Sequence, residues 1–144
     1  MNLRPNIYFF SENISFKLEN KTIVKKWFVN AAKSEGFKIN NLNYIFCDDE
    51  YLRSKNIEFL NHKTFTDIIT FQYDDEPGFV SGDIFISIER VKFNAKKFKK
   101  DFNNELHRVM IHGLMHLCGY KDKTALQKKQ MRALETKYLK LIEC

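Results

Sequence analysis

Apolar residues occur along this chain in two arrangements, short runs and longer helical stripes. Five short segments are rich in β-branched and aromatic residues, or alternate apolar with polar positions, as is typical of strands. We therefore predict strands at residues 7–10, 14–18, 42–47, 68–73 and 83–88. The stretch 74–78, Asp-Asp-Glu-Pro-Gly, has the composition of a turn, so the chain reverses there and returns as the last strand.

Apolar residues at helical spacing predict four helices. These helices span residues 22–35, 49–60, 102–118 and 124–141. Asn20 stands where a side chain can cap the first helix, and Asp48 or Asp49 can cap the second. Gly36 and Gly119 follow the first and third helices, where a residue in the left-handed conformation commonly ends a helix.

The order of these elements predicts an α+β fold. We expect a single mixed sheet of about four or five strands with helices packed on it. No internal repeat, linker or change in composition divides the sequence, so we expect one domain over residues 1–144. The helix predicted at 102–118 has the longest apolar stripe and is expected to lie centrally in this fold.

The composition indicates a soluble globular protein. The chain has 144 residues, of which 44% are hydrophobic and 29% charged, which is enough to bury a core without disulfide or metal staples. No window reaches the ~20 consecutive apolar residues of a membrane-spanning helix. The first twenty residues lack the apolar run of a secretory signal. Cys47, Cys118 and Cys144 form no CxxC pair and are typical of reduced thiols. We therefore expect a cytoplasmic protein with no membrane partner.

The chain is basic. It carries 24 Lys and Arg against 18 Asp and Glu, for a formal charge of +6, which favours a polyanionic partner such as nucleic acid. A solvated, lysine-rich surface gives the same count, so both interpretations stay open. One run of lysines, directly before the helix at 102–118, is a candidate phosphate-contacting face: Lys92, Lys96, Lys97, Lys99 and Lys100.

The chemistry is concentrated in the third helix and the residues after it. His112 and His116 are four apart, so both imidazoles lie on one face of that helix and can converge on one ion. Gly119 lets the chain reverse, which brings Asp122 back as a third ligand. Three protein ligands with an open fourth position are typical of a catalytic zinc site, whereas structural sites have four. We therefore predict one divalent ion, with zinc expected.

Two neighbouring residues are excluded from the ligand set. His107 is five residues before His112 and points elsewhere on the helix. Glu105 is either a hydrogen-bond partner behind the ligands or an exposed helix acid. The ligand spacing also matches the metzincin peptidases, which need a Glu just after the first His as general base. Gly113 occupies that position, so peptidase chemistry is disfavoured, and a close neighbour can approach the helix there.

Three motifs in register carry a family resemblance. From His112 to Asp122 the chain reads His-Gly-Leu-Met-His-Leu-Cys-Gly-Tyr-Lys-Asp, residues 66–71 read Thr-Asp-Ile-Ile-Thr-Phe, and residues 82–84 read Gly-Asp-Ile. These resemble the YbeY family of bacterial endoribonucleases and rRNA maturation factors. Its signature is His-Gly-x-x-His-x-x-Gly-Tyr-Asp-His, with Thr-Asp-Val-Leu-Ser-Phe and Gly-Asp-Ile upstream. The resemblance runs from about Asn56 to the last helix.

The chain departs from the family pattern at two positions. The third ligand of the family is usually His, whereas this chain has Asp122, which still ligates zinc and suits harder ions better. The family usually has an Arg where this chain has Leu60. His62, Lys63 and Arg53 are candidates to replace that Arg, and they can equally be ordinary loop or helix-surface residues.

The resemblance implies a metal-dependent endoribonuclease, a hydrolase of ester bonds that is specific for single-stranded RNA. It implies a role in ribosome biogenesis, namely late 16S rRNA 3′-end maturation and ribosome quality control. The implied partners are ribosomal RNA in the small subunit and ribosomal or assembly proteins. His112, His116 and Asp122 would hold the metal, and Asp83 and His62 are the candidate catalytic residues.

Two other functions stay open from the sequence. The chain can be a ribosome-assembly binding factor whose metal site is structural, an alternative that the missing Arg at Leu60 favours. A metallopeptidase is the weaker alternative because Gly113 cannot act as a general base.

Overall fold

A computed structural model describes residues 5–60 and 66–142 of the chain. Its strands are β1 (Asn6–Glu12), β2 (Lys38–Cys47), β3 (Ile68–Gln72) and β4 (Phe79–Ser87). Its helices are α1 (Lys21–Ser34), α2 (Asp49–Leu60), α3 (Ile88–Lys97), α4 (Phe102–Leu117) and α5 (Ala125–Ile142). This is the α+β fold with a mixed sheet that the sequence predicts. None of the described helices has the length and apolar character needed to cross a bilayer.

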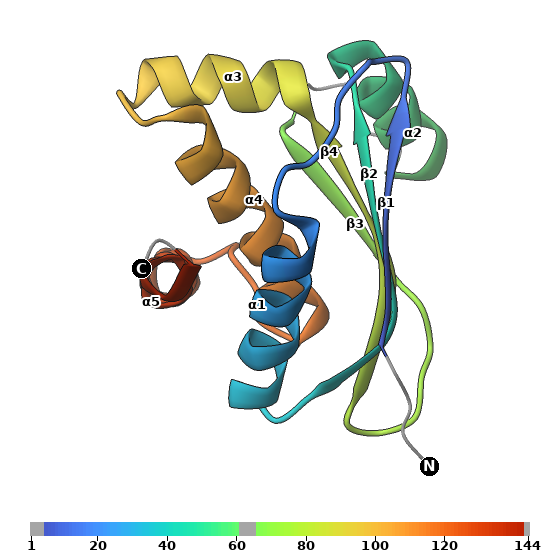
Figure 1. The fold of residues 1–144 in the computed structure, drawn as a ribbon, viewed down its shortest axis with the longest axis vertical. Coiled ribbons are helices and arrows are strands. Elements are labelled where there is room, and N and C mark those ends of the chain that lie inside the picture. Colours follow the sequence, from blue (N-terminus) through green and yellow to red (C-terminus); the bar gives the residue numbers. More distant parts are fainter. Residues whose placement is uncertain (1–4, 61–65, 143–144) are drawn as a thin grey trace.

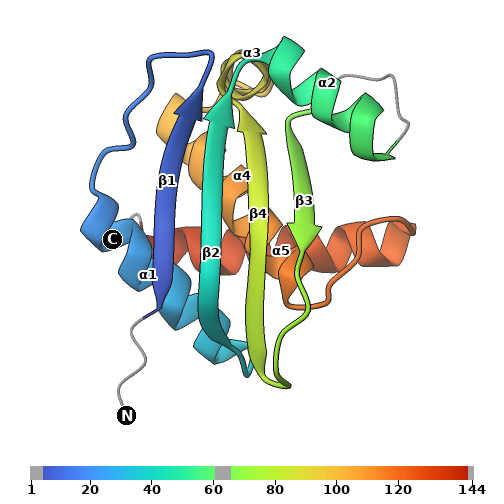
Figure 2. The same cartoon turned by 90° about the vertical axis from the view of Figure 1, so that its right-hand side faces the viewer.

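The strands lie in the order β1-β2-β4-β3 (Figure 2). β1, β2 and β4 run parallel, and β3 pairs antiparallel with β4. The parallel neighbours are joined by helical crossovers, as parallel pairing requires. β3 and β4 follow each other directly through the acidic turn, so they form the hairpin expected from the sequence.

The helices divide unequally between the two faces of the sheet (Figure 1). α1 and α4 cover one face, with α5 packed against both helices. The main hydrophobic core lies in this layer and includes the fully buried rings of Phe28 and Tyr44. On the other face, α2 covers a small cluster of Cys47, Leu52 and Ile69 at one end of β3 and β4. α4 thus lies in the middle of the fold, between the sheet and α5.

Glycine lets α4 lie directly on the sheet. A Cβ atom at Gly113 would stand 2.9 Å from Cγ2 of Ile84 and 3.0 Å from Cδ1 of Ile68. The close approach expected from the sequence at this position is therefore an approach to β3 and β4. At Gly82 a Cβ atom would stand 2.5 Å from the backbone oxygen of Phe71, so β3 and β4 also require a glycine there.

Two sequence predictions about elements are wrong. Residues 14–18 form no strand, although their side chains do alternate, with Ile14, Phe16 and Leu18 turned toward the core and their neighbours exposed. The described residues also form five helices where the sequence predicts four, because α3, which begins directly after β4 ends at Ser87, is not predicted. Ser87 caps α3 by accepting a hydrogen bond from the backbone N–H of Arg90 at 3.1 Å.

The predicted helix ends are confirmed at three positions and wrong at one. Asp48 caps α2, accepting a 2.8 Å hydrogen bond from the N–H of Tyr51. Asn20 precedes α1 in a left-handed conformation and its side chain makes no capping bond, so the predicted cap is wrong there. Gly36 (φ +86°) and Gly119 (φ +102°) adopt the expected left-handed conformation after α1 and α4. Gly119 thereby turns the chain back toward α4.

Candidate metal centre

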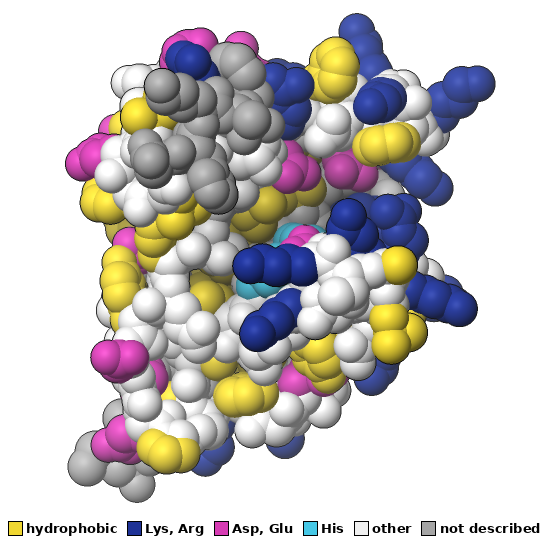
Figure 3. All heavy atoms as spheres, turned by 180° about the vertical axis from the view of Figure 1, so that it is seen from behind, with side chains coloured by type: hydrophobic (Ala, Val, Ile, Leu, Met, Phe, Trp, Pro, Cys, Tyr) yellow, Lys and Arg dark blue, Asp and Glu magenta, His cyan; other side chains and the backbone are white. Residues whose placement is uncertain are grey.

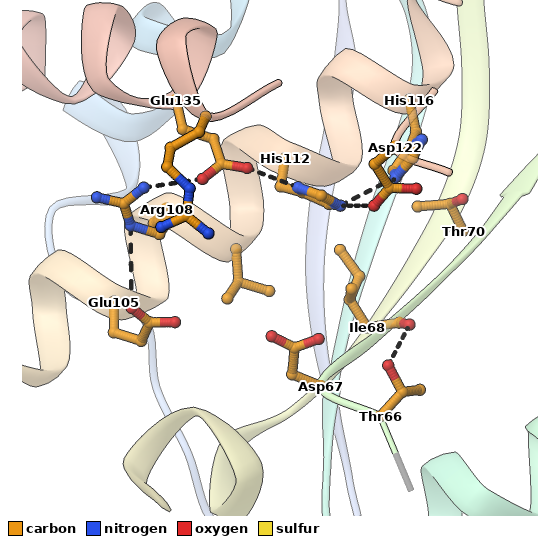
Figure 4. Close-up of a pocket in the computed structure, with 12 residues that line it drawn as sticks. Thr66, Asp67, Ile68, Thr70, Glu105, Arg108, His112, His116, Asp122 and Glu135 are labelled. Carbon is orange, nitrogen blue, oxygen red and sulfur yellow. Dashed lines mark hydrogen bonds and ion pairs between the residues drawn. The ribbon is translucent and has the colours of Figure 1, made fainter. Parts of the chain in front are cut away.

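The predicted ligands come together at one end of α4 (Figure 4). His112 and His116 lie one turn apart on this helix, and Asp122 follows in the loop that Gly119 begins. The two Nε2 atoms are 2.9 Å apart. Oδ2 of Asp122 lies 3.2 Å from Nε2 of His112 and 3.4 Å from Nε2 of His116.

These three separations fit a small divalent ion. Ligands held at about 2.0–2.1 Å from one zinc ion in tetrahedral directions stand roughly 3.3 Å apart. All three separations in the triad are close to this distance. Among residues 5–60 and 66–142, no other group of three or more His, Cys, Asp and Glu residues has its ligand atoms within 4.8 Å of one another. Two imidazoles and one carboxylate also form a donor set that zinc accepts. The residues therefore fit a metal ion.

Hydrogen bonds behind the ligands fix both imidazoles. Nδ1 of His112 lies 2.7 Å from Oε2 of Glu135 on α5, and Nδ1 of His116 lies 3.0 Å from the backbone oxygen of Tyr120. Both partners are acceptors, so each Nδ1 carries the proton. Each Nε2 then presents a lone pair to the shared centre, which is the arrangement metal-binding histidines commonly have.

The charges around His112 favour its protonated form when no ion is bound. Burial alone would lower the pKa of His112, but the hydrogen bond and charge of Glu135, together with the charges of Asp122 and Asp67, outweigh burial and raise this pKa. The same negative surroundings favour a divalent cation. A bound ion must therefore displace a proton from the ring.

The triad opens into a pocket of about 440 Å³. Its further lining includes Asp67 just before β3, Thr70 in the middle of β3, Glu105 and Arg108 from α4, and Arg132 from α5. Figure 3 shows this hollow from outside, with histidine and acidic side chains lying deeper than the Lys and Arg side chains around them. A structural zinc site closed by four ligands would leave no such space beside the ion.

One known protein family matches this chain along almost its whole length. The family described as Endoribonuclease YbeY matches residues 6–143, a range that contains all three triad residues and every element of the fold.

The chain belongs to the endoribonuclease YbeY family.

Curated YbeY relatives match over most of their length. The endoribonuclease YbeY of Amoebophilus asiaticus is 46% identical over 136 residues, covering 94% of this chain and 92% of that protein. The one of Cytophaga hutchinsonii is 49% identical over 135 residues, covering 94% of each. A solution structure of a Thermotoga maritima protein superposes with a TM-score of 0.66 at 26% identity, covering 94% of this chain and 88% of that one.

Within this YbeY fold, Arg108 orders the acids that lie behind the triad. Its Nη1 donates to Oε1 of Glu135 at 2.8 Å, and its Nε lies 4.0 Å from Oε1 of Glu105. Glu105 is 6% exposed, so the alternative of an exposed acid is wrong, and the hydrogen-bond partner behind His112 is Glu135 instead of Glu105. Burial raises the pKa of Glu105 and of Asp67.

A second contact, made by α1, fixes the ligand loop. Glu35 at the end of α1 accepts a 2.5 Å hydrogen bond from the hydroxyl of Tyr120, and its other oxygen accepts one from Tyr138 of α5. Tyr120 is the residue whose backbone oxygen holds His116, and it lies two positions before Asp122. The carboxylate of Glu35, at the end of α1, therefore ties the loop that carries Asp122 to α1 and α5.

The other sequence candidates lie apart from the triad. Asp83 alternates along β4 with Gly82 and Ile84, which both face α4, so its side chain points to the opposite face of the sheet. There it accepts hydrogen bonds from Asn43, at 3.0 Å, and from Tyr73. A catalytic role for Asp83 stays a prediction.

Of the three candidates to replace the family Arg, the structure describes only Arg53. His62 and Lys63 lie outside the described residues. Leu60, at the position of the missing Arg, is 43% exposed at the end of α2. Arg53 is half-buried on α2 and does not line the pocket. His107 packs its ring against Trp27, with the ring centroids 5.7 Å apart, and takes no part in the triad, as expected.

Proposed function

We propose that this chain is a zinc-dependent endoribonuclease that cuts single-stranded ribosomal RNA. The observation that carries the proposal is the triad of His112, His116 and Asp122 in a chain of the YbeY family. The distances between its ligand atoms are close to those around a tetrahedral ion, and the triad lines an open pocket. The two imidazoles and one carboxylate favour zinc over magnesium or calcium, which prefer oxygen ligands alone.

When bound, the ion would supply a Lewis acid that polarises a phosphate oxygen and lowers the pKa of a water molecule. The chain itself holds the two imidazoles in place. The carboxylate of Glu135 holds the Nδ1 proton of His112, and the backbone oxygen of Tyr120 holds that of His116. Both rings therefore keep the orientation that directs Nε2 to the centre, before substrate arrives.

The pocket also contains groups suited to an RNA phosphate. Arg132 is exposed at the pocket, so its guanidinium group is available to pair with phosphate oxygens, and Arg108, although paired with Glu135, adds a second positive charge to the lining. Asp67 lies across the pocket from Arg108, just before β3 (Figure 4). Its carboxyl has a pKa raised by burial, which suits a group that takes up and returns a proton during hydrolysis.

In the cell, this activity would serve the late maturation of the 16S rRNA 3′ end and ribosome quality control. The whole of residues 1–144 would act as one domain in the cytoplasm, on the small ribosomal subunit and with ribosomal or assembly proteins. The net charge of +6 supports a polyanionic substrate.

The alternatives have less support. A ribosome-assembly factor with a structural ion needs no pocket beside the triad, whereas this triad lines one of about 440 Å³. A peptidase needs a carboxylate just after the first histidine, but position 113 faces Ile84 and Ile68. A side chain there would point into the core.

The test compares the wild type with His116→Ala, and with His107→Ala as a matched control outside the triad. We expect metal-loaded wild type and His107→Ala to cut single-stranded RNA and to leave duplex RNA intact, with no cleavage by His116→Ala. Cells carrying only His116→Ala should accumulate unprocessed 16S 3′ ends. Metal-loaded wild type that cuts no RNA, or His116→Ala that supports normal 16S maturation, would contradict the proposal.

A further inference from the structure

We infer that the outward face of α3 and the turn after it form a second RNA-binding surface, which holds a single-stranded segment beside the catalytic pocket. This inference rests on the proposed function. The surface, called the α3 face below, consists of Lys92, Phe93, Lys96, Lys97, Phe98, Lys99 and Lys100, all of which are exposed. In Figure 3, Lys, Arg and hydrophobic side chains project together where α3 reaches the molecular surface.

The α3 face carries most of the net charge of the chain. Residues 88–101 contain six basic and two acidic side chains, a net of +4 out of +6 for all 144 residues. Arg90 is engaged with Asp49 at 2.8 Å, but all five lysines of this segment are exposed. Lys96 and Lys97, in the last turn, also complement the helix dipole. Lys99 and Lys100 follow the C-cap at the same end of the helix, where their backbone N–H groups bond the last carbonyls, whereas Lys92 lies away from that end and is not explained by the dipole.

Lys99 occupies a backbone position where lysine is unusual. Its φ is +55°, just past the end of α3, where glycine or asparagine is the common residue. Residues with a Cβ atom are disfavoured in this left-handed conformation. The sequence thus keeps a positive charge at a position where the backbone favours a different residue.

Two exposed aromatic rings stand among these cations. Phe93 is 57% exposed and Phe98 is 56% exposed. The guanidinium of Arg90 lies 5.3 Å from the ring centre of Phe93, and Nζ of Lys97 lies 5.5 Å from that of Phe98. Single-stranded RNA is bound by this combination, in which bases stack on exposed rings while cations contact the phosphates.

The position of the α3 face suits a strand that also enters the pocket. A hollow of about 480 Å³ is lined by Lys92, Phe93, Lys96 and Phe102, among others. Phe102 is the first residue of α4, and His112 stands ten residues further along the same helix. Ten helical residues rise about 15 Å. The α3 face is therefore a few nucleotides away from the triad.

Charge and burial favour RNA over the other partners of a basic helix. A helix that enters a membrane surface needs a broad apolar face, but the apolar stripe of α3, made of Ile88, Val91 and Ala95, is buried in the fold. The centres of protein interfaces are depleted in lysine. Five exposed lysines around two isolated rings therefore fit a nucleic acid strand better than a bilayer or a protein groove.

The test measures binding of a fluorescent single-stranded RNA oligonucleotide as a function of salt concentration, with metal chelated to prevent cleavage. One variant, Lys92→Gln/Lys96→Gln, removes two charges, and its matched control, Lys26→Gln/Lys33→Gln, removes two exposed lysines from α1. We expect the α3 variant to reduce the slope of log affinity against log salt by about 1.4, at ~0.7 per lost phosphate contact. The α1 variant should bind as wild type.

A second variant separates stacking from plain hydrophobic contact. Phe93→Leu/Phe98→Leu keeps apolar volume but removes both rings, so we expect about tenfold weaker binding per lost stacked base. In metal-loaded protein, both α3 variants should raise KM for a long RNA and leave kcat unchanged. A very short RNA that cannot reach α3 should be cut at the wild-type rate.

Failure of this inference is distinguishable from failure of the proposed function. Wild-type protein that binds or cuts no RNA would overturn both. Wild type that cuts RNA while either α3 variant retains wild-type RNA affinity would overturn the second surface alone. The second surface is likewise overturned if wild type binds anionic lipid vesicles through the α3 lysines, or if the leucine variant binds RNA as tightly as wild type.

Discussion

Nδ1 of His112 lies 2.7 Å from Oε2 of Glu135, a residue 23 positions further along the chain on a different helix. The carboxylate is buried, at 7% exposure, and its other oxygen accepts a hydrogen bond from Arg108 at 2.8 Å. The contact fixes the tautomer and orientation of His112, so α5 supports the candidate metal centre without contributing a residue to the triad.

The first prediction concerns that carboxylate. Glu135→Gln should weaken metal affinity by about 10–100-fold, because the imidazole loses its charged acceptor. Competition between the protein and a chromogenic chelator measures the affinity. Glu105→Gln is the matched control, since Glu105 is also buried beside Arg108 but does not contact His112. Equal losses of metal affinity in the two variants would show that the effect comes from any buried acid in the pocket and does not depend on the hydrogen bond to His112.

The second prediction concerns the loop of the third ligand. Tyr120→Phe removes the hydroxyl that donates to Glu35, a charge-assisted hydrogen bond of about 1.5–3 kcal/mol. We expect lower metal affinity and an altered absorption spectrum of the cobalt-substituted protein, because Asp122 is held less firmly. Tyr138→Phe loses a bond to the same carboxylate from α5 and should change stability without changing the spectrum. Identical spectra for wild type and Tyr120→Phe would show that the loop needs no such contact.

The third prediction concerns the approach of α4 to the sheet. Gly113→Ala should destabilise the fold by about 1–3 kcal/mol, because its Cβ would meet Ile84 at 2.9 Å in a filled core. Chemical denaturation measures the loss. Ile84→Val removes the Cδ1 methyl of Ile84, one of the three methyl groups that stand within 3.0 Å of that Cβ, so the double variant should lose less stability than the two single variants combined. If the double variant instead loses the sum of the two single losses of unfolding free energy, residues 113 and 84 do not interact.

The fourth prediction concerns the thiols. Burial raises the pKa of Cys47 and of Cys118 to about 12, with nearby acids adding to the effect. Only about one thiol in 10⁴ is then a thiolate at pH 8, and its reactivity rises with pH up to that pKa. Both thiols should resist alkylation in the folded protein and react after unfolding, as mass spectrometry of the labelled peptides would show. Rapid labelling of Cys118 at pH 8 in folded protein would contradict this burial.

The sequence predicts the ligand set because the signal there is local. His112 and His116 are one turn apart, and Gly119 reverses the chain, so Asp122 has a short path back. The groups behind the ligands carry no such signal. Glu135 and Glu35 reach the site from other helices, and in the sequence each resembles an ordinary helix acid. Only the packing of α1 and α5 against α4 identifies them.

The differences between the predicted and observed elements have physical causes. Residues 14–18 alternate between apolar and polar because Phe16 and Leu18 pack onto the core. Such alternation indicates which side chains are buried, but it does not indicate whether the backbone pairs with a neighbouring strand. The apolar pattern does not reveal α3, because its buried stripe has only three residues and begins directly after β4 with no turn between them. Ser87 is both the last residue of the strand and the cap of the helix, so apolar pattern alone does not separate the two elements.

The metal site is tested most directly by the metal content of purified protein, measured by mass spectrometry for wild type, Asp122→Ala and the control His107→Ala. The triad predicts about one divalent ion per chain in wild type and in His107→Ala, and its loss in Asp122→Ala. Wild type that holds no ion after incubation with zinc, manganese or nickel would contradict a metal centre at this triad. So would Asp122→Ala that binds the ion with wild-type affinity.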